Sequence, residues 1–69
     1  MPLTVQLDHA LIRRKQVEAQ TGLPRSTLYK LIANGDFPAP VRLTVKAVAW
    51  VRADVDSWIA GRIAASKPQ

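Results

Sequence analysis

A short polar run near the middle of the chain, Arg25-Ser26-Thr27, carries side chains suited to recognising nucleic acid. An arginine can bond two acceptors on one guanine, and Ser and Thr hydroxyls can reach base edges or phosphates. Tyr29 and Lys30 follow one helical turn later, where they could contact the sugar-phosphate backbone. Taken alone, the run is equally compatible with a polar surface that contacts only water. The surrounding residues must therefore decide between a nucleic-acid interface and a solvated surface.

Basic residues are concentrated between positions 13 and 52. That span contains eight Lys and Arg residues against two acidic ones, and the whole chain has a formal net charge of +5. Such a surplus favours a polyanionic partner without identifying it. For Arg52, a contact with DNA and a position that simply flanks a helix are equally compatible with the sequence. The residues expected to approach DNA phosphates are Arg13, Arg14, Lys15 and Arg52.

Residues for catalysis or metal binding are scarce. The chain has one histidine, His9, and no cysteine, which argues against a nucleophile–base pair and against a cysteine-ligated zinc site. Asp54 and Asp56 are explained by the favourable position of acidic residues at the start of a helix. We therefore expect a protein that is not an enzyme and that uses no metal, cofactor or small-molecule ligand.

The chain shows no signal for a membrane or for secretion. No apolar run approaches the roughly 20 residues that a membrane span requires. Residues 1–10 contain no basic residue and do not resemble a signal peptide. Together with the absence of cysteine, these features predict a cytoplasmic protein.

Two short helices are predicted in the first half of the chain. Good helix formers occupy residues 14–21, and Gly22 follows where a left-handed residue commonly ends a helix. A second helix over residues 24–33 would have Pro24 in its first helical position. Such a pair is a helix-turn-helix candidate, in which the second helix enters the major groove. The residues of that helix expected to face inward are Leu28, Leu31 and Ile32.

A β-hairpin is predicted next. Residues 41–43 and 48–51 are rich in strand-forming residues, and residues 44–47 would form the turn. Arg42 and Lys46 lie near its two ends, so the hairpin could serve as a wing that contacts the DNA backbone or the minor groove. It could also simply cover the core. The hairpin residues expected to be buried are Leu43, Val48 and Trp50.

A third helix is predicted from residue 53 onward. Its apolar residues at helical spacing are Val55, Trp58, Ile59 and Ile63. Aromatic burial dominates the energetics of so small a domain. We therefore expect Trp50, Trp58 and Phe37 in the core rather than stacked on bases.

These elements predict the fold class. Sixty-nine residues allow one domain. The expected architecture is mainly α with a small β-hairpin, a single winged helix-turn-helix domain over residues 11–63. Residues 1–10 would form an N-terminal arm and residues 64–69 a C-terminal tail.

Several motifs resemble the AlpA family of prophage regulators, which have a winged helix-turn-helix fold similar to MerR proteins and excisionases. The resemblance covers about residues 11–62. Its carriers are TGLPRSTLYKLI at 21–32, GDFPAPV at 35–41, AW at 49–50 and VDSWI at 55–59. By position, the resemblance puts Arg25, Ser26, Thr27, Tyr29 and Lys30 on the recognition helix and Arg42 and Lys46 on the wing.

The resemblance implies a bacterial, nucleoid-associated regulator that binds double-stranded DNA of an integrated element in a sequence-specific way. Several copies could act on repeated sites, and RNA polymerase or integrase could be a protein partner. Two alternatives stay open at this point. The chain could be an excisionase-type factor that bends DNA during recombination, or an interaction module whose basic face binds an acidic partner.

Overall fold

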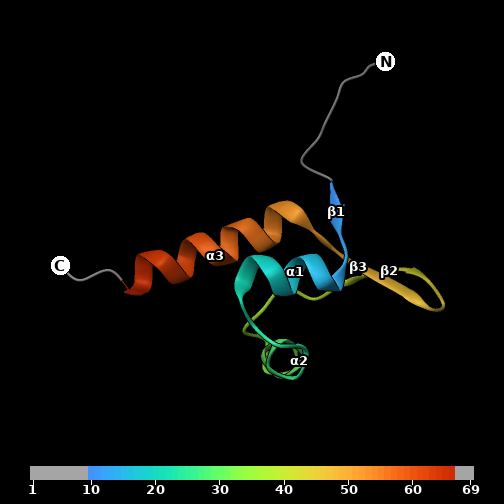
Figure 1. The fold of residues 1–69 in the computed structure, drawn as a ribbon, viewed down its shortest axis with the longest axis horizontal. Helices are drawn as coiled ribbons and strands as arrows, with labels where there is room; N and C mark the ends of the chain where they lie inside the picture. Colours follow the sequence, from blue (N-terminus) through green and yellow to red (C-terminus); the bar gives the residue numbers. More distant parts are fainter. Residues whose placement is uncertain (1–9, 67–69) are drawn as a thin grey trace, which may run out of the picture.

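A computed structural model describes residues 10–66 of the chain (Figure 1). Apart from Ala10, the expected N-terminal arm with its His9 lies outside the described residues, and so do the last three residues of the expected tail. The elements in chain order are β1 (Leu11–Ile12), α1 (Arg14–Thr21), α2 (Arg25–Ala33), β2 (Val41–Thr44), β3 (Ala47–Val51) and α3 (Arg52–Ser66). The fold is mainly helical with a small antiparallel sheet, which confirms the predicted class.

The turn between α1 and α2 is fixed by Gly22 and Pro24. Gly22 is left-handed with φ at 73°, and its N–H donates to the Glu18 carbonyl at 2.8 Å, which ends α1 as predicted. Pro24 was expected as the first helical residue, but this is wrong by one position. Its ψ of 162° is extended, so it precedes the helix, and its carbonyl accepts the first helical bond from Leu28 N–H at 3.0 Å.

The sheet has three strands in the order β1-β3-β2, all antiparallel. The predicted hairpin is correct, but the predicted turn over residues 44–47 is two residues too long. Thr44 pairs with Ala47, which leaves only Val45-Lys46 in the turn. Thr44 Oγ1 accepts the Lys46 N–H at 3.2 Å, so a hydroxyl supports a turn that lacks Gly, Asn and Asp.

The core lies where the helices meet the sheet. Trp50 is fully buried, and its ring Nε1–H donates to the Pro38 carbonyl at 3.0 Å. Phe37 is buried edge-on against Trp58, with ring centroids 4.8 Å apart. The buried cluster is Ile12, Val17, Leu28, Phe37, Trp50 and Val55, with Leu31, Ile32, Val48, Trp58 and Ile59 among the partly buried residues packed on it.

Leu43, which the sequence predicts in the core, is exposed, and so is Ile63 at the end of the apolar pattern of the third helix. Leu43 is 43% exposed because the hairpin extends beyond the helices (Figure 1), and every residue of the β2 strand is exposed. Ile63 is 52% exposed because the second half of α3 also projects from the body (Figure 1). α3 continues to Ser66, three residues past the expected end of the folded region.

Among residues 10–66 no helix has both the length and the apolar character needed to cross a membrane.

Candidate nucleic-acid interface

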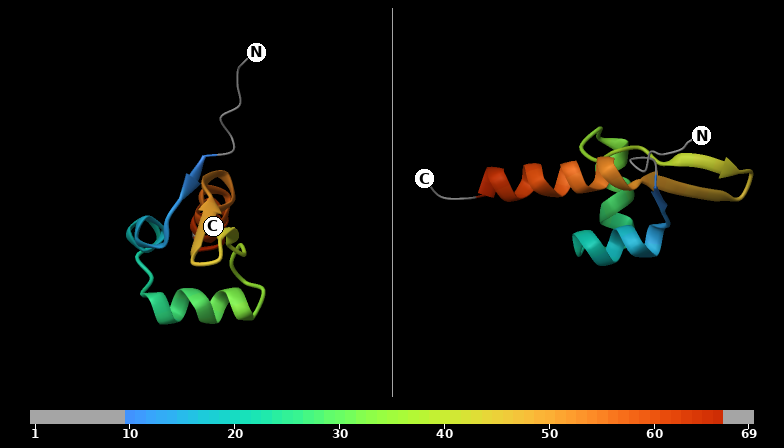
Figure 2. Two further views of the ribbon diagram at one scale, coloured as in Figure 1. Left: turned by 90° about the vertical axis from the view of Figure 1, so that its right-hand side faces the viewer. Right: turned by 90° about the horizontal axis from the view of Figure 1, so that it is seen from above.

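α2 lies at one edge of the molecule (Figure 2), and its outer face carries a set of polar side chains. The helix is anchored from within by Leu28, which is fully buried, and by the half-buried Leu31 and Ile32. This orientation follows from the apolar spacing, and it turns the polar residues outward. Of the predicted recognition residues, Thr27 is half-buried, and the exposed ones are Arg25, Ser26, Tyr29 and Lys30.

The start of α2 is also open to a ligand. None of the described residues supplies a side-chain cap for this end, because Pro24 stands in the capping position. The first N–H groups of a helix have no partner within the helix and attract anions. Arg25 is the first residue of this helix, and its guanidinium lies 5.7 Å from the centre of the Tyr29 ring. This end of the helix therefore offers hydrogen-bond donors and positive charge together.

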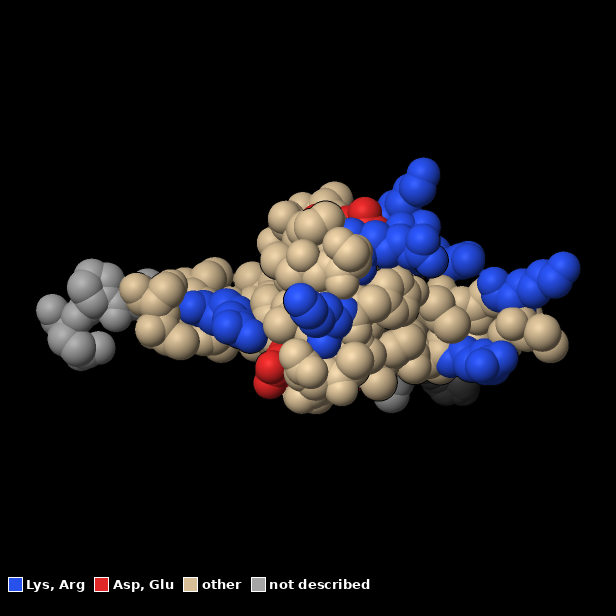
Figure 3. Space-filling model, turned by 90° about the horizontal axis from the view of Figure 1, so that it is seen from below, with Lys and Arg blue, Asp and Glu red and all other residues tan. Residues whose placement is uncertain are grey.

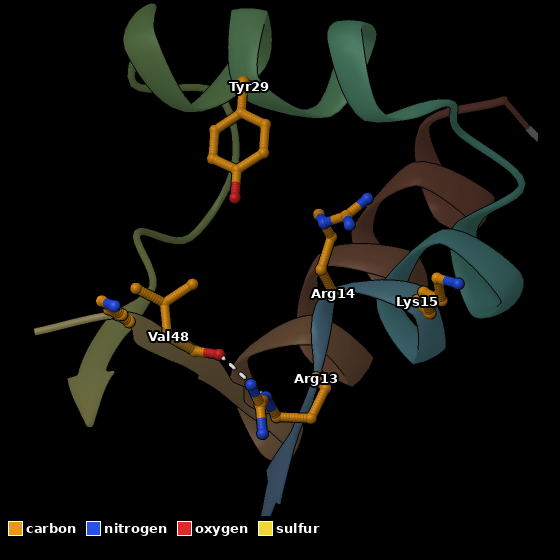
Figure 4. A pocket seen from close by; sticks show the side chains of 6 residues that line it. Arg13, Arg14, Lys15, Tyr29 and Val48 are labelled. Carbon is orange, nitrogen blue, oxygen red and sulfur yellow. Dashed lines mark hydrogen bonds between the residues drawn. The ribbon is translucent and has the colours of Figure 1, made fainter. Parts of the chain in front are cut away.

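A basic hollow of about 440 Å³ lies between α1, α2 and the hairpin (Figure 4). The start of α1 provides three of its cations, the hairpin turn provides a fourth, and α2 provides an aromatic ring. Within the described residues 10–66, no acidic side chain lines it. The lining residues are Arg13, Arg14, Lys15, Tyr29, Lys46 and Val48. We call this feature the basic hollow.

Arg13 connects the α1 side of the hollow to the hairpin side. Its Nε–H donates to the Val48 carbonyl at 3.2 Å, which links the β1–α1 junction to β3 (Figure 4). Its backbone N–H donates to Gln16 Oε1 at 2.9 Å, so the start of α1 is fixed as well. Arg13 therefore has a structural role in addition to its charge.

The other cations of the hollow differ in how far their charge is already balanced. Arg14 Nη1 lies 2.8 Å from Glu18 Oε2, and both side chains are about one-third exposed or less, at 35% and 26%. Lys15 and Lys46 are exposed and have no ion-pair partner within residues 10–66. An anion in the hollow would thus meet the charges of Lys15, Lys46 and Arg13, which have no ion-pair partner within residues 10–66, and an arginine shared with Glu18.

Tyr29 is part of the outer face of α2 and also lines the basic hollow. It is 37% exposed on α2, and its hydroxyl points toward the hollow (Figure 4). Its ring packs edge-on against Trp50 with centroids 6.4 Å apart, which fixes its direction from the core. Tyr29 is therefore held where a nucleic-acid strand that runs past α2 would contact its hydroxyl.

Lys and Arg side chains are spread over the molecular face that carries α2 (Figure 3). They extend over the body and along the hairpin, with few acidic side chains between them. The predicted wing residue Arg42 lies on β2, paired with Val48, and does not line the hollow. Arg52 lies apart from this group. It begins α3, which is on the opposite side of the fold from α2 (Figures 1 and 2), and its Nε is 3.9 Å from Asp56.

Sequence reasoning identified the cations but missed two of their contacts. The Arg14–Glu18 pair could have been found, because a spacing of four residues places opposite charges side by side on a helix. The contact of Arg13 with Val48 had no local signal, since it depends on how β1 and α1 dock on β3.

Known proteins resemble this chain over most of its length. A family model described as "Prophage CP4-57 regulatory protein (AlpA)" matches residues 10–63. "Uncharacterized protein ORF88" of Enterobacteria phage P4 is 45% identical over 67 residues, covering 97% of this chain and 76% of that protein. "DNA-binding transcriptional activator AlpA" of Escherichia coli (strain K12) is 31% identical over 58 residues, covering 75% of this chain and 83% of that protein. The chain therefore belongs to the AlpA family of prophage regulatory proteins.

Proposed function

We propose that this protein is a transcriptional regulator of a phage or integrated mobile element that binds double-stranded DNA at specific sequences. α2 enters the major groove, and the β2–β3 hairpin acts as a wing on the backbone or the minor groove. The E. coli relative is named a DNA-binding transcriptional activator, which supports a DNA partner. Such a partner places the protein in the bacterial cytoplasm, at the nucleoid.

The observation that carries the proposal is the basic hollow beside α2. A helix that enters a major groove has a sugar-phosphate strand along each flank, so cations are needed next to the helix and not only on it. The hollow supplies them from two other elements, with Arg13, Arg14 and Lys15 on the α1 side and Lys46 on the hairpin side. A surface that only met water would not require charges from two elements to converge beside a third.

The proposal gives the predicted recognition residues of α2 different roles. Arg25 stands at the start of the helix, where base contacts of a recognition helix are concentrated, and it would specify a base. Ser26 and Thr27 would reach base edges, or a DNA phosphate bound by the free N–H groups at the start of α2. Tyr29 and Lys30 would contact the strand that borders the groove. Arg52 has no role in this interface, and Arg42 would meet phosphates only through the wing.

Selection from random duplex DNA tests the proposal directly. The wild-type protein should enrich a defined motif, and Arg25→Ala should weaken binding to that motif by about 1–3 kcal/mol while relaxing the preference at one base pair. Lys30→Ala is a matched control, because loss of a phosphate contact weakens all sequences alike. Failure of the wild-type protein to enrich any duplex would overturn the proposal. An equal loss of specific and random binding on Arg25→Ala would remove only the role of Arg25.

A further inference from the structure

The tip of the hairpin carries an unusual apolar side chain. Val45 is 86% exposed, the highest value among the large apolar side chains of residues 10–66. It occupies one of the two turn positions, where Gly, Asn and Asp are the residues that ordinarily fit. Nothing in the fold packs on it, so neither the core nor the turn accounts for a branched apolar residue there.

The surroundings of Val45 show what kind of partner fits it. Lys46 is its neighbour in the turn, and Arg42 lies on the strand that leads to it. A purely apolar protein surface would leave these two charges without partners when Val45 was covered. A site with apolar walls and anionic rims suits all three residues. The minor groove of DNA has this character, with sugars on its walls and phosphates along its edges.

The arrangement of the elements brings the hairpin tip to a minor groove when α2 binds the major groove. The inference rests on this proposed function. The hairpin runs across the direction of α2 and extends past it (Figures 1 and 2). The basic hollow lies between the two. With α2 in the major groove, the hollow covers the strand that borders the groove. The hairpin crosses that strand, and its tip reaches the adjacent minor groove.

We propose that Val45 packs into this minor groove and gives the protein a preference for A·T pairs beneath the wing tip. A G·C pair carries the guanine N2 amino group on the groove floor, whereas A·T and T·A present only acceptors and leave more room. A branched apolar side chain gains contact with the A·T floor. Against G·C it meets the amino group and leaves that donor without a hydrogen bond. Val45 is thus a specificity-determining residue that makes no hydrogen bond.

The experiment compares the motifs selected from random duplex DNA by wild-type protein, Val45→Ala and Val45→Ile. Wild-type protein and Val45→Ile should show an A·T preference at a position outside the α2 contacts. Val45→Ala should lose that preference and bind the wild-type motif about tenfold more weakly, as expected for two methyl groups returned to water. Ile63→Ala removes another exposed apolar side chain, 52% exposed on α3, and should leave motif and affinity unchanged.

Inosine then identifies the groove. An I·C pair lacks the N2 amino group, so it matches A·T in the minor groove and G·C in the major groove. Placed beneath the tip, I·C should bind wild-type protein as well as A·T does. Binding as weak as that of G·C would overturn the proposal, as would an unchanged motif and affinity for Val45→Ala. Either result leaves the proposed function standing, whereas no enrichment by wild-type protein would remove both. Circular dichroism confirms that each variant is folded.

Discussion

Replacement of Lys46 by Gln should weaken the salt dependence of DNA binding by the equivalent of one phosphate contact. Lys46 lines the basic hollow from the hairpin turn, is exposed, and has no ion-pair partner within residues 10–66. Its loss therefore removes charge from the interface without breaking a contact that stabilises the fold. Gln retains most of the length of the side chain and its ability to donate a hydrogen bond.

The magnitude follows from counterion release. Each phosphate neutralised by a Lys or Arg contributes about −0.9 to the slope of log K against log salt. A phosphate contact contributes little to the affinity at about 1 M salt. Near 0.1 M salt, one contact therefore raises the affinity about eightfold. Lys46→Gln should therefore reduce the steepness of the slope by about 0.9 and weaken binding about eightfold near 0.1 M salt, with a smaller loss as salt rises.

Fluorescence anisotropy of a labelled duplex, titrated at several salt concentrations between about 50 and 200 mM, measures this slope. Arg52→Gln is the matched control, since it removes the same net charge from the start of α3, away from α2. It should leave the slope nearly unchanged. Equal slopes for Lys46→Gln and wild-type protein would remove Lys46 from the interface. An equal effect of both variants would mean that net charge acts at a distance and that the hollow has no special role.

Three further substitutions probe other contacts. Glu18→Gln frees the Arg14 guanidinium, so anisotropy should show severalfold tighter binding and a steeper salt slope, and unchanged binding would contradict a role for Arg14. Tyr29→Phe keeps the packing on Trp50 and removes the hydroxyl, so binding should weaken by about 1 kcal/mol at an unchanged melting temperature; a lowered melting temperature would point to a structural role instead. Trp50→Ala should cost about 3–5 kcal/mol, comparable to the whole stability of so small a domain. Its thermal unfolding by circular dichroism should lose cooperativity, and a wild-type transition would refute the placement of Trp50 at the centre of the core.

The helices were predictable because their signals are local. Spacings of three and four among Leu28, Leu31 and Ile32 determine which face of α2 is buried, and the same spacings turn Arg25 and Lys30 outward. Gly22 marks the end of α1 because only a left-handed residue allows the chain to turn there. In each case a few neighbouring residues contain the whole physical cause.

The strands were predicted less accurately because their environment is not local. The apolar residues of the hairpin suggested that Leu43 is buried, yet the hairpin extends past the helices and has no surface to cover it. The pairing of β1 with β3 was missed because two residues, Leu11–Ile12, carry too short a pattern to predict a partner strand.

The sequence by itself determined the three helices, the hairpin, the aromatic core and the identity of the cations. Only the tertiary structure decided that Arg13, Arg14, Lys15 and Lys46 share one hollow while Arg52 lies elsewhere. The physical reason is that charge is set residue by residue. The distance between charges depends on how α1 and the hairpin dock around Trp50, and no short stretch of sequence contains that information.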